Sequence, residues 1–97
     1  MNISDMDPVV INIPCPTKKE AEKLCKEMLD KELCGTAKIT PTFLMYPGPK
    51  GASGEEVVLI SLKTTKIKLT DIHEFILKNH SWGTPCIEVM PMVADMC

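Results

Sequence analysis

The apolar positions in the first third of the chain change from the spacing of a strand to the spacing of a helix. Residues 9–13, Val-Val-Ile-Asn-Ile, form a β-branched run that is typical of a buried strand. Pro14 and Pro16 end that strand, because proline has no amide hydrogen to donate to a sheet ladder. Beyond them, apolar residues recur at the i, i+3, i+4, i+7 and i+8 positions of one helix face: Ala21, Leu24, Cys25, Met28 and Leu29.

The two ends of this helix carry their own signals. Thr17 and Glu20 form a capping box, in which the Thr17 hydroxyl accepts from the Glu20 N–H and the Glu20 carboxylate reaches back to the Thr17 N–H. Gly35 lies just beyond the helix, where a closing turn can adopt a positive φ. Charged residues four apart predict ion pairs on the solvated side, namely Glu22–Lys26, Lys23–Glu27 and Glu27–Lys31.

The middle of the chain predicts two further strands and a loop between them. Residues 36–46 alternate in polarity, and Pro41 within them predicts a bulge or an unpaired edge. Residues 47–54, Pro-Gly-Pro-Lys-Gly-Ala-Ser-Gly, predict a mobile loop that is too long for a tight hairpin. Residues 55–65 are apolar on both faces, which favours a central place in the sheet.

The last third predicts a second helix and a final strand. The helix covers about residues 66–79, is capped by Thr64 or Thr65, and has one apolar face, formed by Leu69, Ile72, Phe75 and Ile76. A loop over residues 80–85, a strand over 86–93 and a short tail over 94–97 follow it.

The order β, α, β, β, α, β predicts one α+β domain over residues 1–97, with residues 1–8 as a flexible N-terminus. Two right-handed βαβ halves give a ferredoxin-like sandwich, a four-stranded antiparallel sheet with two helices on one face. The other face would then expose Val57, Leu59 and Leu44, and such apolar patches usually mark an interface. The pattern therefore predicts self-association.

Composition narrows the possible classes of partner and compartment. The net charge is −2 without a Lys/Arg cluster, so no nucleic acid is expected as a partner. No apolar run approaches the ~20 residues that cross a bilayer, and the first eight residues lack the basic cluster of a targeting signal. We therefore expect a cytoplasmic protein with no membrane insertion. The cysteines are odd in number and never spaced C-x-x-C, which favours small buried hydrophobes in a reducing compartment: Cys15, Cys25, Cys34, Cys86 and Cys97.

Few residues carry a chemical signal. No nucleophile–base spacing and no phosphate-binding glycine motif is present, so no enzyme is predicted. His80 ends the second helix beside the single tryptophan, Trp82, and is either a helix cap favoured by the dipole or part of a ligand or metal site. Met90, Met92 and Cys97 offer soft sulfur donors that suit Cu(I), although methionine also fills gaps in cores and interfaces.

Two segments resemble the CutA divalent-cation-tolerance family. They are Leu62-Lys63-Thr64-Thr65 before the second helix and His80-Ser81-Trp82-Gly83-Thr84-Pro85-Cys86-Ile87 after it. The first helix and the Glu55-Glu56 pair are similar too, and the resemblance spans residues 9–93. In this chain Ser81 replaces the family's proline after the histidine, and Cys86 replaces its glutamate.

The resemblance implies a homotrimer of ferredoxin-like subunits, with sheets packed around a threefold axis and no enzymatic activity. It also implies a part in tolerance of copper or another divalent metal. By position, a polar cleft between subunits would contain Glu56, Lys63, His80 and Trp82. The architecture also resembles that of PII-type signal proteins, so one alternative is a signalling subunit that binds a small anionic ligand in that cleft. A scaffold for a protein partner is another alternative.

Overall fold

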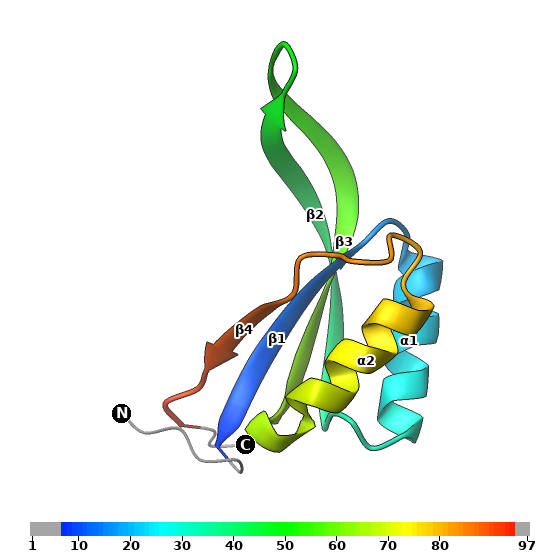
Figure 1. The fold of residues 1–97 in the computed structure, drawn as a ribbon, viewed down its shortest axis with the longest axis vertical. Coiled ribbons are helices and arrows are strands. Elements are labelled where there is room, and N and C mark those ends of the chain that lie inside the picture. Colours follow the sequence, from blue (N-terminus) through cyan, green and yellow to red (C-terminus); the bar gives the residue numbers. More distant parts are fainter. Residues whose placement is uncertain (1–6, 95–97) are drawn as a thin grey trace.

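The computed structural model of the protein describes residues 7–94. The elements follow one another in the order β1 (Pro8–Cys15), α1 (Lys18–Asp30), β2 (Thr36–Gly48), β3 (Gly51–Thr65), the 3-10 turn η1 (Lys66–Lys68), α2 (Leu69–Asn79) and β4 (Glu88–Pro91). The strands form one antiparallel sheet in the order β2-β3-β1-β4. Both helices cover the same face of this sheet (Figure 1), which is the ferredoxin-like arrangement predicted from the sequence.

The core lies between the sheet and the helices. Every second residue of β1 is buried, because strand side chains alternate between the two faces. These residues pack with the apolar faces of the helices and with β3 in one cluster, whose least exposed members include Ile11, Ile13, Ile60, Leu62, Met28, Ile72 and Ile76. The same alternation turns Val10, Asn12 and Pro14 toward the open face of the sheet.

β2 and β3 form a hairpin that extends well beyond the rest of the sheet (Figure 1). Their pairing is continuous up to Gly48 opposite Gly51, so only residues 49 and 50 remain for the turn. The prediction of a long loop over residues 47–54 is therefore wrong. Gly51 has a φ of 112°, a conformation that side chains rarely adopt and that lets the chain reverse tightly.

Pro41 lies in this hairpin, opposite Val58, in an unbroken register. The predicted bulge is therefore absent, and the alternative prediction of an edge is confirmed, because β2 is one of the two edge strands of the described sheet. An edge tolerates proline because only one side of the strand needs hydrogen bonds.

The two ends of α1 agree only in part with the sequence predictions. Thr17 Oγ1 accepts from the Glu20 N–H at 3.2 Å, as predicted. The reciprocal bond is not made, since Glu20 turns instead to Ser81. After α1 the positive φ falls on Glu32, at 58°, and not on Gly35. On the exposed side of α1, Glu22 pairs with Lys18 and Lys26 pairs with Asp30, instead of the predicted pair between Glu22 and Lys26.

The second helix is preceded by a turn instead of a side-chain cap. Thr65 occupies the cap position of η1 without a side-chain cap hydrogen bond. The Thr64 hydroxyl donates to the Leu33 carbonyl oxygen at 2.7 Å, which ties β3 to the segment after α1.

Both ends of the described part of the chain are joined to the sheet. The Asp7 carbonyl accepts from the Lys66 N–H at 3.1 Å, and β1 begins at Pro8, the last residue of the segment predicted as a flexible N-terminus. Residues 1–6 and 95–97 lie outside the described part of the chain. β4 covers only Glu88–Pro91 of the strand predicted over residues 86–93.

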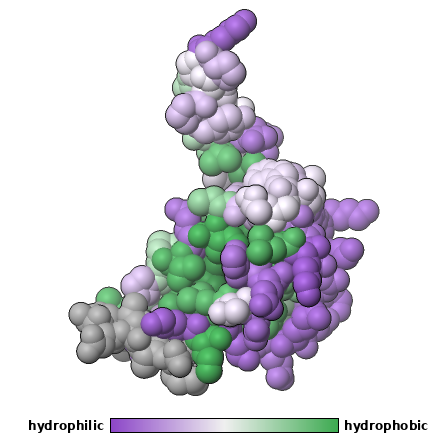
Figure 2. Space-filling view, viewed as in Figure 1, coloured by the Kyte–Doolittle hydropathy of each residue, from purple (hydrophilic) through white to green (hydrophobic). Residues whose placement is uncertain are grey.

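Apolar surface lies on the open face of the sheet, on the hairpin and beside α2. Of the predicted open-face patch, Leu44 is exposed and Leu59 half-buried, but Val57 is only 5 % exposed. The hairpin exposes more, with Phe43 at 60 % and Met45 at 64 %. Figure 2 shows further apolar surface beside α2, where the β4 end of the sheet is uncovered, against the hydrophilic outer surface of the helices. Between residues 7 and 94, no helix has the length and apolar character needed to cross a bilayer.

Candidate metal centre

His80 lies where the end of α2 meets the end of β1. Its backbone N–H donates to the Ile76 carbonyl at 2.9 Å, and only 5 % of the residue is exposed. The ring Nε2 is 2.7 Å from the Pro14 carbonyl oxygen, and Nδ1 is 3.1 Å from the backbone N of Trp82. A carbonyl can only accept, so Nε2 carries the proton and Nδ1 accepts from the Trp82 N–H. These contacts fit the neutral Nε2–H tautomer, and His80 is both a helix terminus and part of a polar cluster.

Cys15 and Glu20 complete that cluster. The two prolines around Cys15 end β1 at this residue, and the Thr17 cap starts α1 so that Glu20 faces the strand end. One donor atom of each residue, the Cys15 Sγ, a Glu20 carboxylate oxygen and a His80 ring nitrogen, lies within 4.8 Å of the other two. Glu20 Oε2 is 3.8 Å from His80 Nδ1 and accepts from the Ser81 N–H at 3.1 Å.

The pKa values of Cys15 and Glu20 shift in opposite directions. Burial raises the pKa of the Cys15 thiol from 9.0 to about 12, and the negative charge of Glu20 acts in the same direction. Burial also raises the pKa of Glu20. Hydrogen bonds from Ser81 and from the Cys15 thiol, together with the charge of His80 when it is protonated, outweigh burial and hold that pKa below 4.5. At neutral pH the cluster therefore contains a carboxylate and a protonated thiol.

This donor set fits a divalent cation of borderline softness. Thiolate sulfur, imidazole nitrogen and carboxylate oxygen are the protein ligands of Zn²⁺, and nitrogen and oxygen donors also suit Cu²⁺. Glu20 Oε2 and His80 Nδ1 are 3.8 Å apart, slightly more than the edge of about 3.3–3.6 Å in a tetrahedron with Zn–N and Zn–O bonds of about 2.0–2.2 Å, so a small closing movement would bring both to ligating distance. Ligation through Nδ1 would leave the Nε2–H bond to Pro14 in place, and such a bond commonly orients a ligating histidine.

The predicted cleft residues do not converge within one chain. His80 and Trp82 lie together, with ring centroids 5.3 Å apart. Lys63 pairs with Val10, four positions along β1 from Pro14, and Glu56 pairs with Phe43 in the hairpin. A cleft that contains all four residues would need more than one copy of the chain.

The predicted sulfur site is only partly described. Met90 is 42 % exposed and lies opposite Val10, while Met92 follows β4 and its N–H donates to the Pro8 carbonyl at 3.0 Å. Cys97 lies outside the described residues.

The sequence interpretation missed the metal-ligand potential of Cys15 and Glu20. It assigned Cys15 to the core and Glu20 to the capping box, and both assignments describe part of what these residues do. The available signal was a cysteine between two prolines, followed by an acidic residue in the first helical turn. Their contact with His80 is not visible in that spacing, because it depends on where α2 ends.

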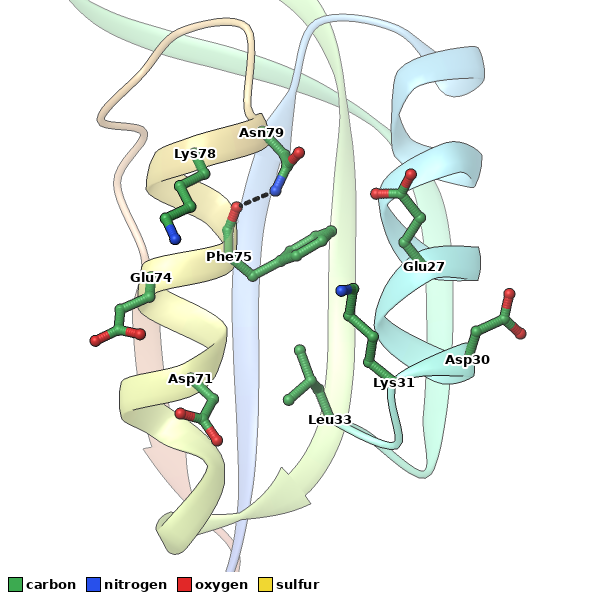
Figure 3. A pocket seen from close by; sticks show the side chains of 9 residues that line it. All are labelled: Glu27, Asp30, Lys31, Leu33, Asp71, Glu74, Phe75, Lys78 and Asn79. Carbon is green, nitrogen blue, oxygen red and sulfur yellow. Dashed lines mark hydrogen bonds between the residues drawn. The ribbon is translucent and has the colours of Figure 1, made fainter.

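A second candidate is the open groove of about 580 Å³ between α1 and α2. Figure 3 shows Asp30 and Glu74 pointing away from it in opposite directions, while the Lys31 amine points inward toward Phe75. Asp30 and Glu74 therefore do not converge, and the described residues that line this groove form no group of three metal-ligating side chains.

Comparison with known proteins agrees with the fold and indicates a family. The family model described as CutA1 divalent ion tolerance protein matches residues 9–96. A divalent-cation tolerance protein CutA from Archaeoglobus fulgidus is 31 % identical over 84 residues, which is 84 % of this chain and 80 % of that protein.

Solved structures of CutA proteins have a similar fold. The structure described as the periplasmic divalent cation tolerance protein CutA from Archaeoglobus fulgidus has a TM-score of 0.85 at 25 % identity, and the match covers 92 % of this chain and 87 % of that chain. CutA1 from Oryza sativa also reaches a TM-score of 0.85, with 96 % of this chain and 87 % of that chain covered, and at 20 % identity it shows likeness of fold.

Proposed function

Because the chain belongs to the CutA1 divalent ion tolerance family, we propose that it is a non-enzymatic, self-assembling subunit that binds a divalent metal ion through Cys15, Glu20 and His80. The observation that carries the proposal is the convergence of sulfur, oxygen and nitrogen donors within 4.8 Å at the junction of β1, α1 and α2. Copper and zinc are the cations whose preferences this donor set meets.

Each of the three residues has a distinct part in this proposal. Glu20 supplies a carboxylate that is already ionised at neutral pH. The hydrogen bond that it accepts from the Ser81 N–H holds this carboxylate beside the His80 ring. His80 supplies Nδ1 after the Trp82 N–H has moved away, while its bond to Pro14 fixes the ring. Cys15 supplies sulfur only after it loses its proton, so cation and proton compete for it.

Three features support assembly into a homotrimer. Half-buried apolar residues lie on the open face of the sheet, and two strand edges are unpaired within the described chain. The hairpin also extends exposed apolar side chains away from the body of its own subunit. An interface would hide this surface and pair the free edges. A reducing compartment such as the cytoplasm suits the three buried free thiols of Cys15, Cys25 and Cys34.

Two alternative binding sites can each be tested separately. A soft Cu(I) site at Met90, Met92 and Cys97 predicts loss of Cu(I) binding when all three are replaced. A small anionic ligand held by Lys63 and His80 between subunits has some support in the shallow hollow around Lys63 on the open face. A thermal-shift screen with nucleotides and metabolites would detect such a ligand, because saturating ligand at about 100 times its Kd adds about 2.7 kcal/mol.

Isothermal titration of the reduced protein with Zn²⁺ and Cu²⁺ tests the main proposal. Cys86 is exposed and lies outside the cluster, which makes Cys86→Ser the matched control for Cys15→Ser. We expect Cys86→Ser to bind as the unsubstituted chain does, and Cys15→Ser to lose the tight binding event. Equal affinity in the two variants would contradict the proposal, provided circular dichroism shows that both are folded.

A further inference from the structure

The three donor residues of the proposed metal centre are almost closed off from solvent. Cys15 and the side chain of His80 are 0 % exposed, and the side chain of Glu20 is 22 % exposed. A cation that approaches from water can therefore reach the Glu20 carboxylate first, but not the other two donors. Some part of the chain has to move before the ion can contact all three residues.

The backbone that follows α2 occupies ligand atoms of this centre. The Ser81 N–H donates to Glu20 Oε2 at 3.1 Å, and the Trp82 N–H donates to His80 Nδ1 at 3.1 Å. Glu20 has a second oxygen and further lone pairs, so it can keep the bond from Ser81 and still bind a cation. Nδ1 of the Nε2–H tautomer has a single lone pair, so the cation and the Trp82 N–H exclude each other there.

Further contacts hold residues 82 and 83 against His80. The Gly83 N–H donates to the His80 carbonyl oxygen at 3.0 Å. The rings of Trp82 and His80 have centroids 5.3 Å apart and are tilted by 50° to each other. Gly83 has a φ of 77°, in the left-handed region that favours glycine. The closed arrangement therefore depends on a residue without a Cβ at this position.

The segments on either side show where movement can occur. The bond from Ser81 to Glu20 anchors the residue before the two, and the His80 N–H is bonded to the Ile76 carbonyl at 2.9 Å. Residues 85–87, between this turn and β4, form neither helix nor strand. Residues 82 and 83 can therefore be displaced while α2 and the Glu20 carboxylate stay in place, because the segment before β4 can absorb the change.

We infer that residues 82 and 83 form a latch, which closes the metal centre over His80 Nδ1 and is displaced when a cation binds there. The inference rests on the proposed metal site and adds how access to that site is controlled. Closure of the latch opposes binding, because the apparent affinity equals the intrinsic affinity multiplied by the fraction of molecules in the open state. A substitution that weakens the latch without changing a ligand should therefore strengthen metal binding.

Gly83→Ala weakens the latch without removing a donor atom. A Cβ at this position meets no atom within 4 Å, so the variant adds backbone strain at a φ of 77° without a clash. Gly51→Ala is the matched control, because Gly51 also has a positive φ and open space around it, but lies in the hairpin turn. In isothermal titration with Zn²⁺, we expect Gly83→Ala to bind roughly fivefold more tightly than the unsubstituted chain, because opening relieves the strain. Gly51→Ala should bind with unchanged affinity.

Hydrogen exchange followed by NMR tests the latch in the unsubstituted chain. Zn²⁺ should speed the exchange of the Trp82 amide at least about tenfold, since this N–H loses its acceptor. The His80 amide, which donates to the Ile76 carbonyl, is the internal control and should exchange at the same rate with and without the ion. The emission of Trp82, the single tryptophan of the chain, should shift to longer wavelength as its ring leaves the His80 ring and becomes more exposed to water.

The possible failures separate the latch from the metal site. If Zn²⁺ binds but the Trp82 amide keeps its protection, the latch is wrong and the metal site stands. If Gly83→Ala is folded and binds no more tightly than Gly51→Ala, the latch is also wrong. If circular dichroism shows that Gly83→Ala does not fold, the exchange result alone decides. If the unsubstituted chain binds no Zn²⁺, both the latch and the proposed metal site are wrong.

Discussion

Glu20 accepts the backbone N–H of Ser81 at 3.1 Å, and this bond joins the first turn of α1 to the turn that follows α2. The same carboxylate lies 3.8 Å from His80 Nδ1. A residue that the local sequence pattern assigns to a helix cap therefore links two elements that are distant in the chain. The bond also explains why the capping box is only half formed.

Replacing Glu20 should lower stability and change its dependence on pH. The folded pKa of Glu20 lies below its ordinary value of 4.5, so the unfolded chain binds the proton more readily. The stabilisation is then fully present above about pH 4.5 and is lost as the pH falls through the folded pKa. We expect Glu20→Gln to lose roughly 1–2 kcal/mol of unfolding free energy near neutral pH, and less in acid.

Denaturant unfolding at several pH values measures this effect. Glu22→Gln is the matched control, because Glu22 is exposed and pairs only with Lys18 at 3.7 Å. The control should change stability by less than about 0.5 kcal/mol. Parallel curves for the two variants would show that Glu20 has no special role.

The cysteines should differ sharply in reactivity. Cys86 is exposed, whereas Cys15, Cys25 and Cys34 are buried. Burial raises the pKa of Cys15 to about 12 and that of Cys25 to about 11, and it also raises the pKa of Cys34. Because the thiolate is the reactive form, we expect these three to react with a thiol reagent only after unfolding.

Kinetics of labelling in a Cys97→Ser background check this expectation. One thiol should react fast in the folded state, and Cys86→Ser should remove that fast phase. A second fast thiol would mean that one of the buried cysteines is accessible in the folded chain.

Metal affinity should rise with pH, because the cation must displace the Cys15 proton. Since the folded pKa of the thiol is about 12, one proton is released for each ion bound. We therefore expect the affinity to increase by about tenfold per pH unit near neutrality. Titrations in two buffers of different protonation enthalpy count the released protons, and a count near zero would exclude Cys15 as a ligand.

The hairpin turn depends on glycine at position 51. A residue with a Cβ would be strained at its φ of 112°, so Gly51→Ala should cost roughly 1–3 kcal/mol. Gly35→Ala is the control, because its Cβ would meet only the Lys63 carbonyl oxygen, at 3.8 Å. Thermal unfolding compares the two, and equal melting temperatures would contradict the observed turn.

The elements that were predicted correctly carry local patterns. The 3.6-residue spacing and the Thr17 hydroxyl define α1 without help from the rest of the chain. Residues 47–54 failed as a prediction because a loop and a tight turn draw on the same residues, Gly, Pro and Ser. Pairing with the opposite strand decides which of the two forms, and the sequence of one segment does not indicate that pairing.

The candidate site was predictable only at His80. Its place at a helix end beside Trp82 marked it as unusual in the sequence. Cys15 and Glu20 each satisfied an ordinary structural interpretation, and their meeting with His80 depends on the long-range contact of β1 with the end of α2. Such contacts come from the tertiary fold, so spacing along the chain could not indicate them.

Crystals soaked in Zn²⁺ and measured at the zinc absorption edge test the central claim most directly. The account predicts one anomalous peak per chain bounded by Cys15 Sγ, a Glu20 oxygen and His80 Nδ1, at distances of about 2.0–2.3 Å. His80 would then bind zinc through Nδ1, while its Nε2–H still donates to the Pro14 carbonyl. A peak at Met90 or another surface position, with the cluster unchanged, would contradict the claim.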